Sequence, residues 1–210
     1  MVSKDIRRRQ FLAAARRDPC RGRLLQRQVE GFSAILDVWQ ERARGGDVRQ
    51  LAYVLATAFH ETAATMQPVR ETLARTDAEA IRRLDAAFAA GRLKSVRQPY
   101  WRPDAEGKSW LGRGLVQLTH RRNYEAMSQV TGVDLVADPS RAMDMGVSVV
   151  ILIEGMRCGS FTGHGLDDYF TPGREDWTGA RRIINGTDRA ELVAGYGRAF
   201  ARALNATSPP

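Results

Sequence analysis

The chain has 210 residues, of which 43% are hydrophobic and 27% are charged. This length allows one sizeable core, and the composition excludes a disordered or fibrous chain. Lysine and arginine outnumber aspartate and glutamate by 32 to 24, for a formal net charge of +8. A basic surface attracts polyanions such as nucleic acid or an anionic cell envelope. The positive residues are scattered among acidic ones, however, which is more typical of a solvated surface than of a nucleic-acid groove.

The two cysteines, Cys20 and Cys158, lie far apart and show no metal-ligand spacing, so we expect free thiols. The charged N-terminus, Met1 to Arg7, leads to no apolar segment of signal-peptide length. No run approaches the roughly 18 apolar residues of a membrane span. We therefore expect a protein that is made in the cytoplasm, does not insert into a membrane and reaches any outside target by a separate exit route. We also expect a monomer.

The first half of the chain shows helical periodicity. Apolar residues from Leu25 to Trp39 recur at steps of four and three, which predicts a helix that ends near Gly45. A second helix is expected to begin near Asp47 and to place Glu61 at its C-terminal end. A third, a surface helix, is expected from the capping-box residue Thr76 to a stop near residue 91.

The residue composition and periodicity change at the start of the second half of the chain. From Ser95 to Leu118 periodicity gives way to Pro, Gly, Trp and Tyr, which predicts a loop with a short hairpin. Helices are then expected over residues 123–130, from Asp138–Pro139 through Glu154, and over residues 188–200. The sequence therefore predicts a mainly α single domain over residues 1–210, with N-terminal helices in residues 1–46 packed on it.

Two carboxylates stand out as candidate catalytic groups. Glu61 is expected at the edge of the apolar stripe of its helix, where partial desolvation favours the neutral form that a proton donor needs. Glu71 follows Pro68, and the neighbouring Arg70 offers a cation that favours an ionised carboxylate. Glycosidic bonds are broken by such a pair, with one carboxyl protonated and one ionised. Hydrolysis of a sugar polymer is therefore the first hypothesis.

The histidines do not build a metal site. The stretch His60-Glu61-Thr62-Ala63-Ala64 has alanine where a zinc protease helix needs its second histidine. His120 and His164 lie in unrelated contexts. We expect neither a metal nor a cofactor.

The segment Gly112-Arg113-Gly114 predicts a tight backbone turn, and neutral polar side chains follow it. Amide and hydroxyl groups beside aromatic rings suit sugars, whose hydroxyls take hydrogen bonds and whose C–H faces take apolar contacts. The candidate sugar-binding residues in and around this segment are Gln117, Thr119, Asn123, Tyr124 and Trp110, and His60 beside Glu61 is a further candidate.

Four blocks of sequence together resemble glycoside hydrolase family 19, the chitinase and endolysin family with a mainly helical, lysozyme-like fold. The blocks are His60-Glu61-Thr62, Gly112 to Thr119, Asn123-Tyr124 and Arg182 to Gly186. They occur in the family's order and cover roughly Leu51 to Phe200. The resemblance implies inverting hydrolysis of β-1,4-linked N-acetylglucosamine polymers.

The resemblance also implies roles for single residues. Glu61 falls on the family's general acid, and Thr119 falls on a Ser or Thr that helps to hold the attacking water. Three further residues fall on sugar-binding positions, namely Gln117, Asn123 and Asn185.

The general base is expected to be Glu71, because shorter bacterial and phage-like members carry an acidic residue at about this offset. The chain departs from plant-type members in lacking multiple cysteines and in its compact loop between Pro99 and Trp110. Glu106 in that loop is the reserve candidate. In an inverting enzyme the acid and base should stand about 6.5 to 9.5 Å apart to leave room for a water molecule.

Chitin and the glycan of peptidoglycan both present N-acetylglucosamine, so both stay open as substrates. The positive charge favours a bacterial wall reached after release by lysis, or an extracellular polymer. Two other classes stay open: a basic helical module that binds nucleic acid, and a glycan-binding protein without catalysis on the same scaffold. We favour the hydrolase, with a polysaccharide rather than nucleic acid as its partner.

Overall fold

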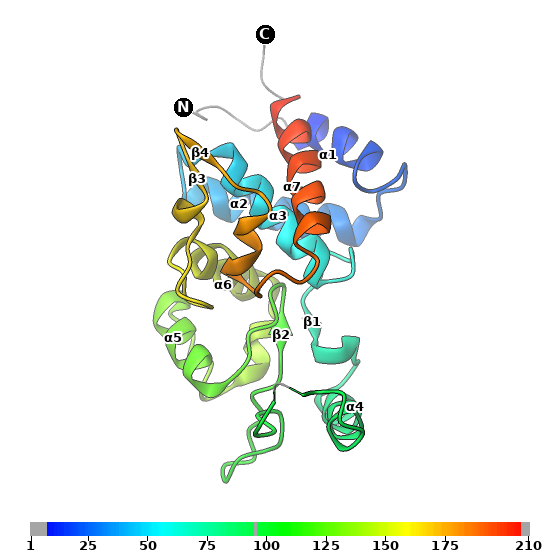
Figure 1. Ribbon diagram of the computed structural model, residues 1–210, viewed down its shortest axis with the longest axis vertical. Coiled ribbons are helices and arrows are strands. Elements are labelled where there is room, and N and C mark those ends of the chain that lie inside the picture. Colours follow the sequence, from blue (N-terminus) through cyan, green and yellow to red (C-terminus); the bar gives the residue numbers. More distant parts are fainter. Residues whose placement is uncertain (1–7, 95, 207–210) are drawn as a thin grey trace. The chain divides into compact units, whose positions relative to one another are not determined.

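The computed structural model describes residues 8–94 and 96–206 (Figure 1). The charged N-terminus with Arg7, and Ser95 at the start of the predicted loop, lie outside the described residues. The described residues form seven α-helices, short 3-10 helices and two small two-stranded sheets. The prediction of a mainly α, lysozyme-like fold is confirmed. Among these residues, no helix combines the length and apolar character needed to cross a membrane.

The described residues divide into two compact units. Unit 1 contains the described residues up to Gln67 and those from Leu152 onward, and unit 2 contains Pro68–Ile151. The chain passes from one unit to the other after Gln67 and again within helix α6 (Met145–Arg157).

Unit 1 is built around helix α3. Its other elements are α1 (Arg8–Arg17), α2 (Gln26–Arg42), the 3-10 helices η3 (Leu166–Asp168) and η4 (Gly179–Ile183), the antiparallel strands β3 (Phe170–Thr171) and β4 (Arg174–Glu175), and α7 (Ala190–Asn205). Helix α3 (Val48–Glu61) is buried from Gln50 to Phe59 and packs against α7 (Figure 1). The rings of Phe11, Phe32 and Phe200 join α1, α2 and α7 around one apolar cluster.

Both ends of α3 follow from its sequence. Asp47 caps the N-terminus, because its carboxylate accepts the Arg49 backbone N–H at 2.8 Å. Thr62 ends the helix: its buried hydroxyl donates to the Ala58 carbonyl and accepts the Met66 N–H. Glu61 therefore occupies the last helical position, as predicted.

Unit 2 holds the Gly112 segment. Its elements are β1 (Val69–Arg70), the 3-10 helix η1 (Glu71–Leu73), α4 (Asp77–Ala89), β2 (Arg113–Gly114), α5 (Arg121–Thr131), the 3-10 helix η2 (Pro139–Met143) and the first part of α6. Strands β1 and β2 pair antiparallel, and Arg113 also bridges to Leu118. The predicted hairpin is therefore a short turn between 113 and 118, whose first strand also pairs with distant residues.

Two sequence predictions are wrong in detail. Asp138 caps η2 rather than the apolar helix, and extended backbone at Asp144 separates η2 from α6. The spacing of Leu192, Tyr196 and Phe200 predicts that Leu192 lies on the buried face of α7, but Leu192 is 43% exposed, because Val193 and Ala194 face the core instead. In both cases the helix exists, but its start or its buried face is shifted.

Gly31 permits a close approach of α2 to the turn after α3. An added Cβ there would lie 2.0 Å from the Met66 carbonyl oxygen, which belongs to the backbone and cannot rotate away. We predict that Gly31→Ala lowers the free energy of unfolding by about 2–3 kcal/mol through overpacking. Urea denaturation measures this change.

Gly195→Ala is the matched control, since nothing lies within 4 Å of an added Cβ at this position in α7. It is expected to raise the stability by about 0.5–1 kcal/mol through helix propensity. Equal stability of the two variants would contradict the close approach.

Candidate active site

Glu61 in unit 1 is held by a buried arginine. Its Oε1 accepts a hydrogen bond from Arg181 Nη1 at 2.6 Å, and the exposed fractions of the two side chains are 16% and 3%. Arg181 lies in η4, and its Nε donates to the Asp188 carbonyl at 2.9 Å. A buried guanidinium is strongly destabilising without a carboxylate, so the pair fixes the position of the Glu61 side chain.

The sequence did not predict this contact. The Glu61 side chain is partly buried, as expected at the edge of the apolar stripe, but its ionic neighbour is the Arg181 guanidinium. Helical periodicity places a residue relative to its own helix, and it contains no information about the group that η4 brings to the end of α3.

His60 lines a cavity of about 540 Å³ within unit 1. Phe59, Tyr196 and the turn at Pro19–Arg21 lie in the same lining, and the Phe59 and Tyr196 rings meet edge to face at 5.0 Å. Burial lowers the pKa of His60 below its ordinary value, although the nearby Glu61 opposes this change. The imidazole is therefore mainly neutral near pH 7, and a neutral imidazole can both donate and accept a hydrogen bond.

Glu71 in unit 2 has both carboxylate oxygens engaged. Oε1 accepts the Tyr100 hydroxyl at 2.7 Å, and Oε2 accepts the Gly112 backbone N–H at 2.8 Å. The Glu71 N–H also donates to the Gly112 carbonyl at 2.7 Å. Burial raises the pKa of Tyr100, and the charge of Glu71 raises it further, so Tyr100 stays a donor at neutral pH. Glu71 is thereby fixed against the predicted turn.

Gly112 is surrounded by three of the candidate side chains. An added Cβ would lie 2.7 Å from Gln117 Oε1, 3.3 Å from Glu71 Oε2 and 3.3 Å from Thr119 Cγ2. Gln117 has a left-handed φ of 55°, and its Nε2 donates to the Val69 carbonyl at 3.0 Å. Asn123 Nδ2 donates to the Thr119 carbonyl at 2.7 Å. The structure therefore gathers Glu71, Gln117, Thr119 and Asn123 in one place.

A second buried arginine supports this group. Arg113, 2% exposed, donates from Nη2 to Asp77 Oδ2 at 2.6 Å and from Nη1 to the Tyr124 hydroxyl at 2.8 Å. Arg70 donates to Asp77 Oδ1 at 2.6 Å. The expectation that Arg70 acts on Glu71 is therefore wrong, because its guanidinium is directed to Asp77.

Two predicted sugar-binding aromatics lie inside the protein. Tyr124 is fully buried, and its hydroxyl donates to the Leu111 carbonyl at 2.7 Å. Trp110 is 6% exposed and donates from Nε1 to Asp104 Oδ2 at 3.0 Å. Their rings meet edge to face at 5.4 Å. Burial leaves Tyr124 no surface for a sugar, so the role of these rings is to support the Gly112 segment from within.

The two remaining candidates are both exposed. Glu106 is exposed and forms an ion pair with Lys108 at 3.0 Å, so it does not join Glu71 at Gly112. Asn185 is exposed in unit 1 just after η4, and its N–H donates to the Arg181 carbonyl at 3.0 Å. Among the described residues, no group of three or more His, Cys, Asp or Glu side chains is placed to hold a metal ion.

Sequence reasoning missed Arg181 and Tyr100. Arg181 directly precedes the Arg182–Gly186 block, which is the only signal in the sequence that could have found it. It lies 120 residues from Glu61, and Tyr100 lies 29 residues from Glu71, so no local spacing connects either pair.

The model of glycoside hydrolase family 19, chitinase class I, matches residues 32–156. Because the match covers more than half of the chain, this protein belongs to glycoside hydrolase family 19. It is therefore a glycosidase of a family that acts on chitin-like polysaccharides. The match includes Glu61 and the Gly112 segment, whereas Arg181 and Asn185 lie beyond it. No curated protein matches the chain.

The stability of the folded protein around the Gly112 segment is expected to depend on pH through the ionisation of Asp77. Burial alone would raise the pKa of Asp77, but hydrogen bonds from Arg113 and Arg70 outweigh it and hold the pKa below its ordinary value. A lowered folded-state pKa stabilises the protein above the unfolded-state value of about 3.9, and this contribution is lost as the pH falls through the folded-state pKa.

We predict that Asp77→Asn lowers the free energy of unfolding at pH 7 by about 1–3 kcal/mol, because it leaves the buried Arg113 without its carboxylate. The difference from the unmodified protein should begin to shrink below about pH 4, where Asp77 in the unfolded chain becomes protonated, and should shrink further as the pH falls through the lower folded-state pKa. Glu125→Gln, which removes an exposed pair with Arg121, is the control and should leave the stability nearly unchanged. Denaturant unfolding from pH 3 to 7 measures both, and a pH-independent difference for Asp77→Asn would contradict this account.

Proposed function

We propose that this glycosidase hydrolyses β-1,4 bonds in N-acetylglucosamine-containing polymers with inversion, with Glu61 as general acid and Glu71 as general base. The environment of Glu71 carries the proposal. Its carboxylate accepts hydrogen bonds from the Tyr100 hydroxyl and the Gly112 N–H, among the polar side chains of the Gly112 segment. Glu106 has no comparable environment, since it is exposed and paired with Lys108.

The proposed reaction is a single displacement. Glu61 gives its proton to the glycosidic oxygen as the bond from that oxygen to the sugar carbon breaks. A water oxygen bonds to the same carbon from the opposite face, and Glu71 takes a proton from this water. Thr119 is proposed to orient the water: its hydroxyl makes no hydrogen bond to the described residues and is free to do so. Arg181 positions Glu61, and Tyr100 positions Glu71.

Sugar binding is proposed for the neutral polar groups on the two units. In unit 2 these are Gln117 and Asn123, and in unit 1 they are Asn185 and the neutral His60 in its cavity. The ring of Tyr196 in the same cavity offers an apolar surface for a sugar face. Chitin and the glycan of peptidoglycan both fit this set, because both carry N-acetylglucosamine.

The site of action proposed for the protein is the bacterial cell wall, reached after release from the cell in which it is made, or an extracellular polymer. The net charge of +8 supports this proposal, since bacterial envelopes are anionic. We propose that the protein works as a monomer.

Product analysis tests the proposal. We predict that the unmodified protein cleaves chitin oligomers or purified peptidoglycan, and that Glu61→Gln and Glu71→Gln each lose about 10²–10⁴-fold in rate with the fold intact. Glu106→Gln should keep its activity. Mass spectrometry of the products measures the rates, and circular dichroism checks the fold.

An active Glu71→Gln together with an inactive Glu106→Gln would transfer the role of base to Glu106. Failure of the unmodified protein to cleave either substrate would contradict the proposed reaction and favour a glycan-binding protein without catalysis.

The stereochemistry of the product tests the mechanism separately. Single displacement at a β bond is expected to give the α-anomer first, and the β-anomer should appear only later through mutarotation. Proton NMR of the first minutes of cleavage of a chitin oligomer distinguishes the two. The β-anomer as the first product would show a retaining mechanism and contradict the role of Glu71 as a base.

A further inference from the structure

His120 follows Thr119 directly and has an unusual backbone conformation. Its φ of 64° and ψ of 135° lie in a region that glycine adopts freely and that residues with a side chain rarely adopt. The surrounding backbone fixes this conformation. The His120 N–H donates to the Trp110 carbonyl at 3.1 Å, and the His120 carbonyl accepts the Asn123 N–H at 2.9 Å. Strained residues that are held in this way concentrate at catalytic and ligand-binding sites.

The side chain of His120 lies beside the group that fixes the candidate base. The centroids of the His120 and Tyr100 rings are 4.3 Å apart, and the two rings are tilted by 51°. The Tyr100 hydroxyl in turn donates to Glu71 Oε1 at 2.7 Å. An imidazole, a phenol and a carboxylate are therefore neighbours in this order.

The imidazole nitrogens of His120 have no partner in the described protein. The residue is exposed at the start of α5, and its side chain does not cap that helix. Within residues 8–94 and 96–206 the side chain forms no hydrogen bond and no ion pair. Partial burial lowers the pKa of His120 below its ordinary value, the charge of Arg122 lowers it further, and the charge of Glu71 opposes this change. The ring is therefore mainly neutral near pH 7, with one nitrogen that donates and one that accepts.

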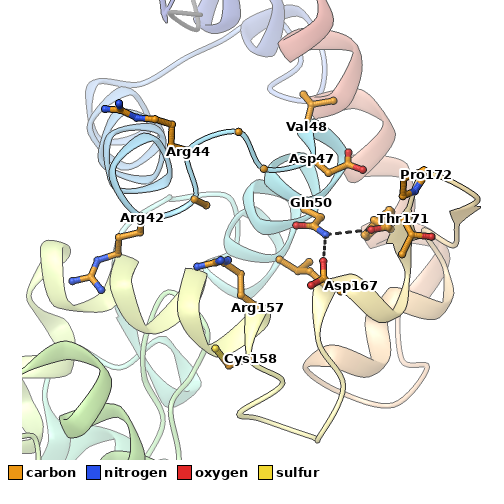
Figure 2. A pocket seen from close by; sticks show the side chains of 15 residues that line it. Arg42, Arg44, Asp47, Val48, Gln50, Arg157, Cys158, Asp167, Thr171 and Pro172 are labelled. Carbon is orange, nitrogen blue, oxygen red and sulfur yellow. Dashed lines mark hydrogen bonds between the residues drawn. The ribbon is translucent and has the colours of Figure 1, made fainter. Parts of the chain in front are cut away.

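The polar groups of the larger cavity in unit 1 differ from His120 in this respect. Figure 2 shows this cavity, of about 800 Å³, where α2 ends and α3 begins. Gln50 Nε2 donates to Asp167 Oδ1 at 2.7 Å, and the guanidinium groups of Arg42 and Arg44 are directed away from the cavity. These side chains are thus bonded within the protein or turned outward, whereas the His120 imidazole is free and held in place by its backbone.

We propose that His120 is a sugar-binding residue, whose free imidazole nitrogen forms a hydrogen bond with a hydroxyl or acetamido group of the sugar held beside Glu71. The inference rests on the proposed function, because it places the sugar against that carboxylate. Hydroxyl and acetamido groups both donate and accept hydrogen bonds, so they match a neutral imidazole. Thr119 and His120 then serve the water and the sugar from adjacent positions of the chain.

Two substitutions separate the nitrogens of His120 from its ring. His120→Phe keeps an aromatic ring for the contact with Tyr100 and removes both nitrogens. His120→Gln keeps a polar end group and removes the ring. Both new residues carry a Cβ, so both meet the same restriction at a positive φ. A difference between the two variants therefore reports on the side chain and not on the backbone.

Binding is measured by titration calorimetry with an N-acetylglucosamine hexamer, in protein that also carries Glu61→Gln to prevent cleavage. His120→Phe should raise the dissociation constant about three- to tenfold, which is the usual effect of one lost hydrogen bond. His120→Gln should stay within about twofold of the parent protein. In protein with Glu61 intact, the loss in His120→Phe should appear in KM, because a bond made before and during the reaction contributes to uniform binding. Tyr100→Phe, which removes a hydrogen bond from the base, should instead lower kcat.

His164→Phe is the matched control. His164 is also exposed, and its ring faces a tyrosine ring, that of Tyr169, at 6.1 Å. Its ionic neighbour is Asp168, and neither partner has a catalytic or sugar-binding role above. This variant should keep the dissociation constant of the parent protein, and circular dichroism confirms that each variant is folded.

The outcomes separate this role from the proposed reaction. The role of His120 is overturned if His120→Phe keeps the parent affinity, or if His120→Phe and His120→Gln bind equally well. If the unmodified protein binds the hexamer without cleaving it, the proposed reaction fails, and weaker binding by His120→Phe alone still supports the role of His120. Absence of binding by the unmodified protein overturns both.

Discussion

In each unit, the candidate residues are organised around a buried guanidinium that needs a carboxylate partner. In unit 1, Arg181 is 3% exposed and pairs with Glu61, which ties η4 to the end of α3. In unit 2, Arg113 is 2% exposed and pairs with Asp77, which ties β2 to the start of α4. A buried charge without its partner costs several kcal/mol, so these pairs restrict the backbone as well as the side chains. This restriction of the backbone also limits where the catalytic candidates can lie.

The two carboxylates consequently have different surroundings. Glu61 meets a permanent cation, whereas Glu71 meets a neutral phenol and a backbone amide. Enzymes commonly place different partners around chemically similar groups. The family match spans both glutamates.

Periodicity predicted the helices well and their contacts poorly. Helices α2, α3 and α5 lie close to where apolar spacing and glycine stops placed them, because those signals act within one turn or two. Asp138 was assigned to the wrong helix, because a cap signal does not show how far its helix continues. Glu71 was located by resemblance to the family, but Tyr100 and Arg181 reach their partners only through tertiary packing, which spacing does not encode.

The family match begins at residue 32, yet the cavity beside His60 is closed on one side by Pro19, Cys20 and Arg21. Phe11, earlier still, packs on Phe200 of the last helix. A chain that began at residue 32 would thus lose Pro19, Cys20 and Arg21 from the wall of that cavity and Phe11 from the aromatic cluster. The residues before the family match are therefore part of the packing of unit 1, and a fragment that keeps this packing has to begin upstream of residue 11.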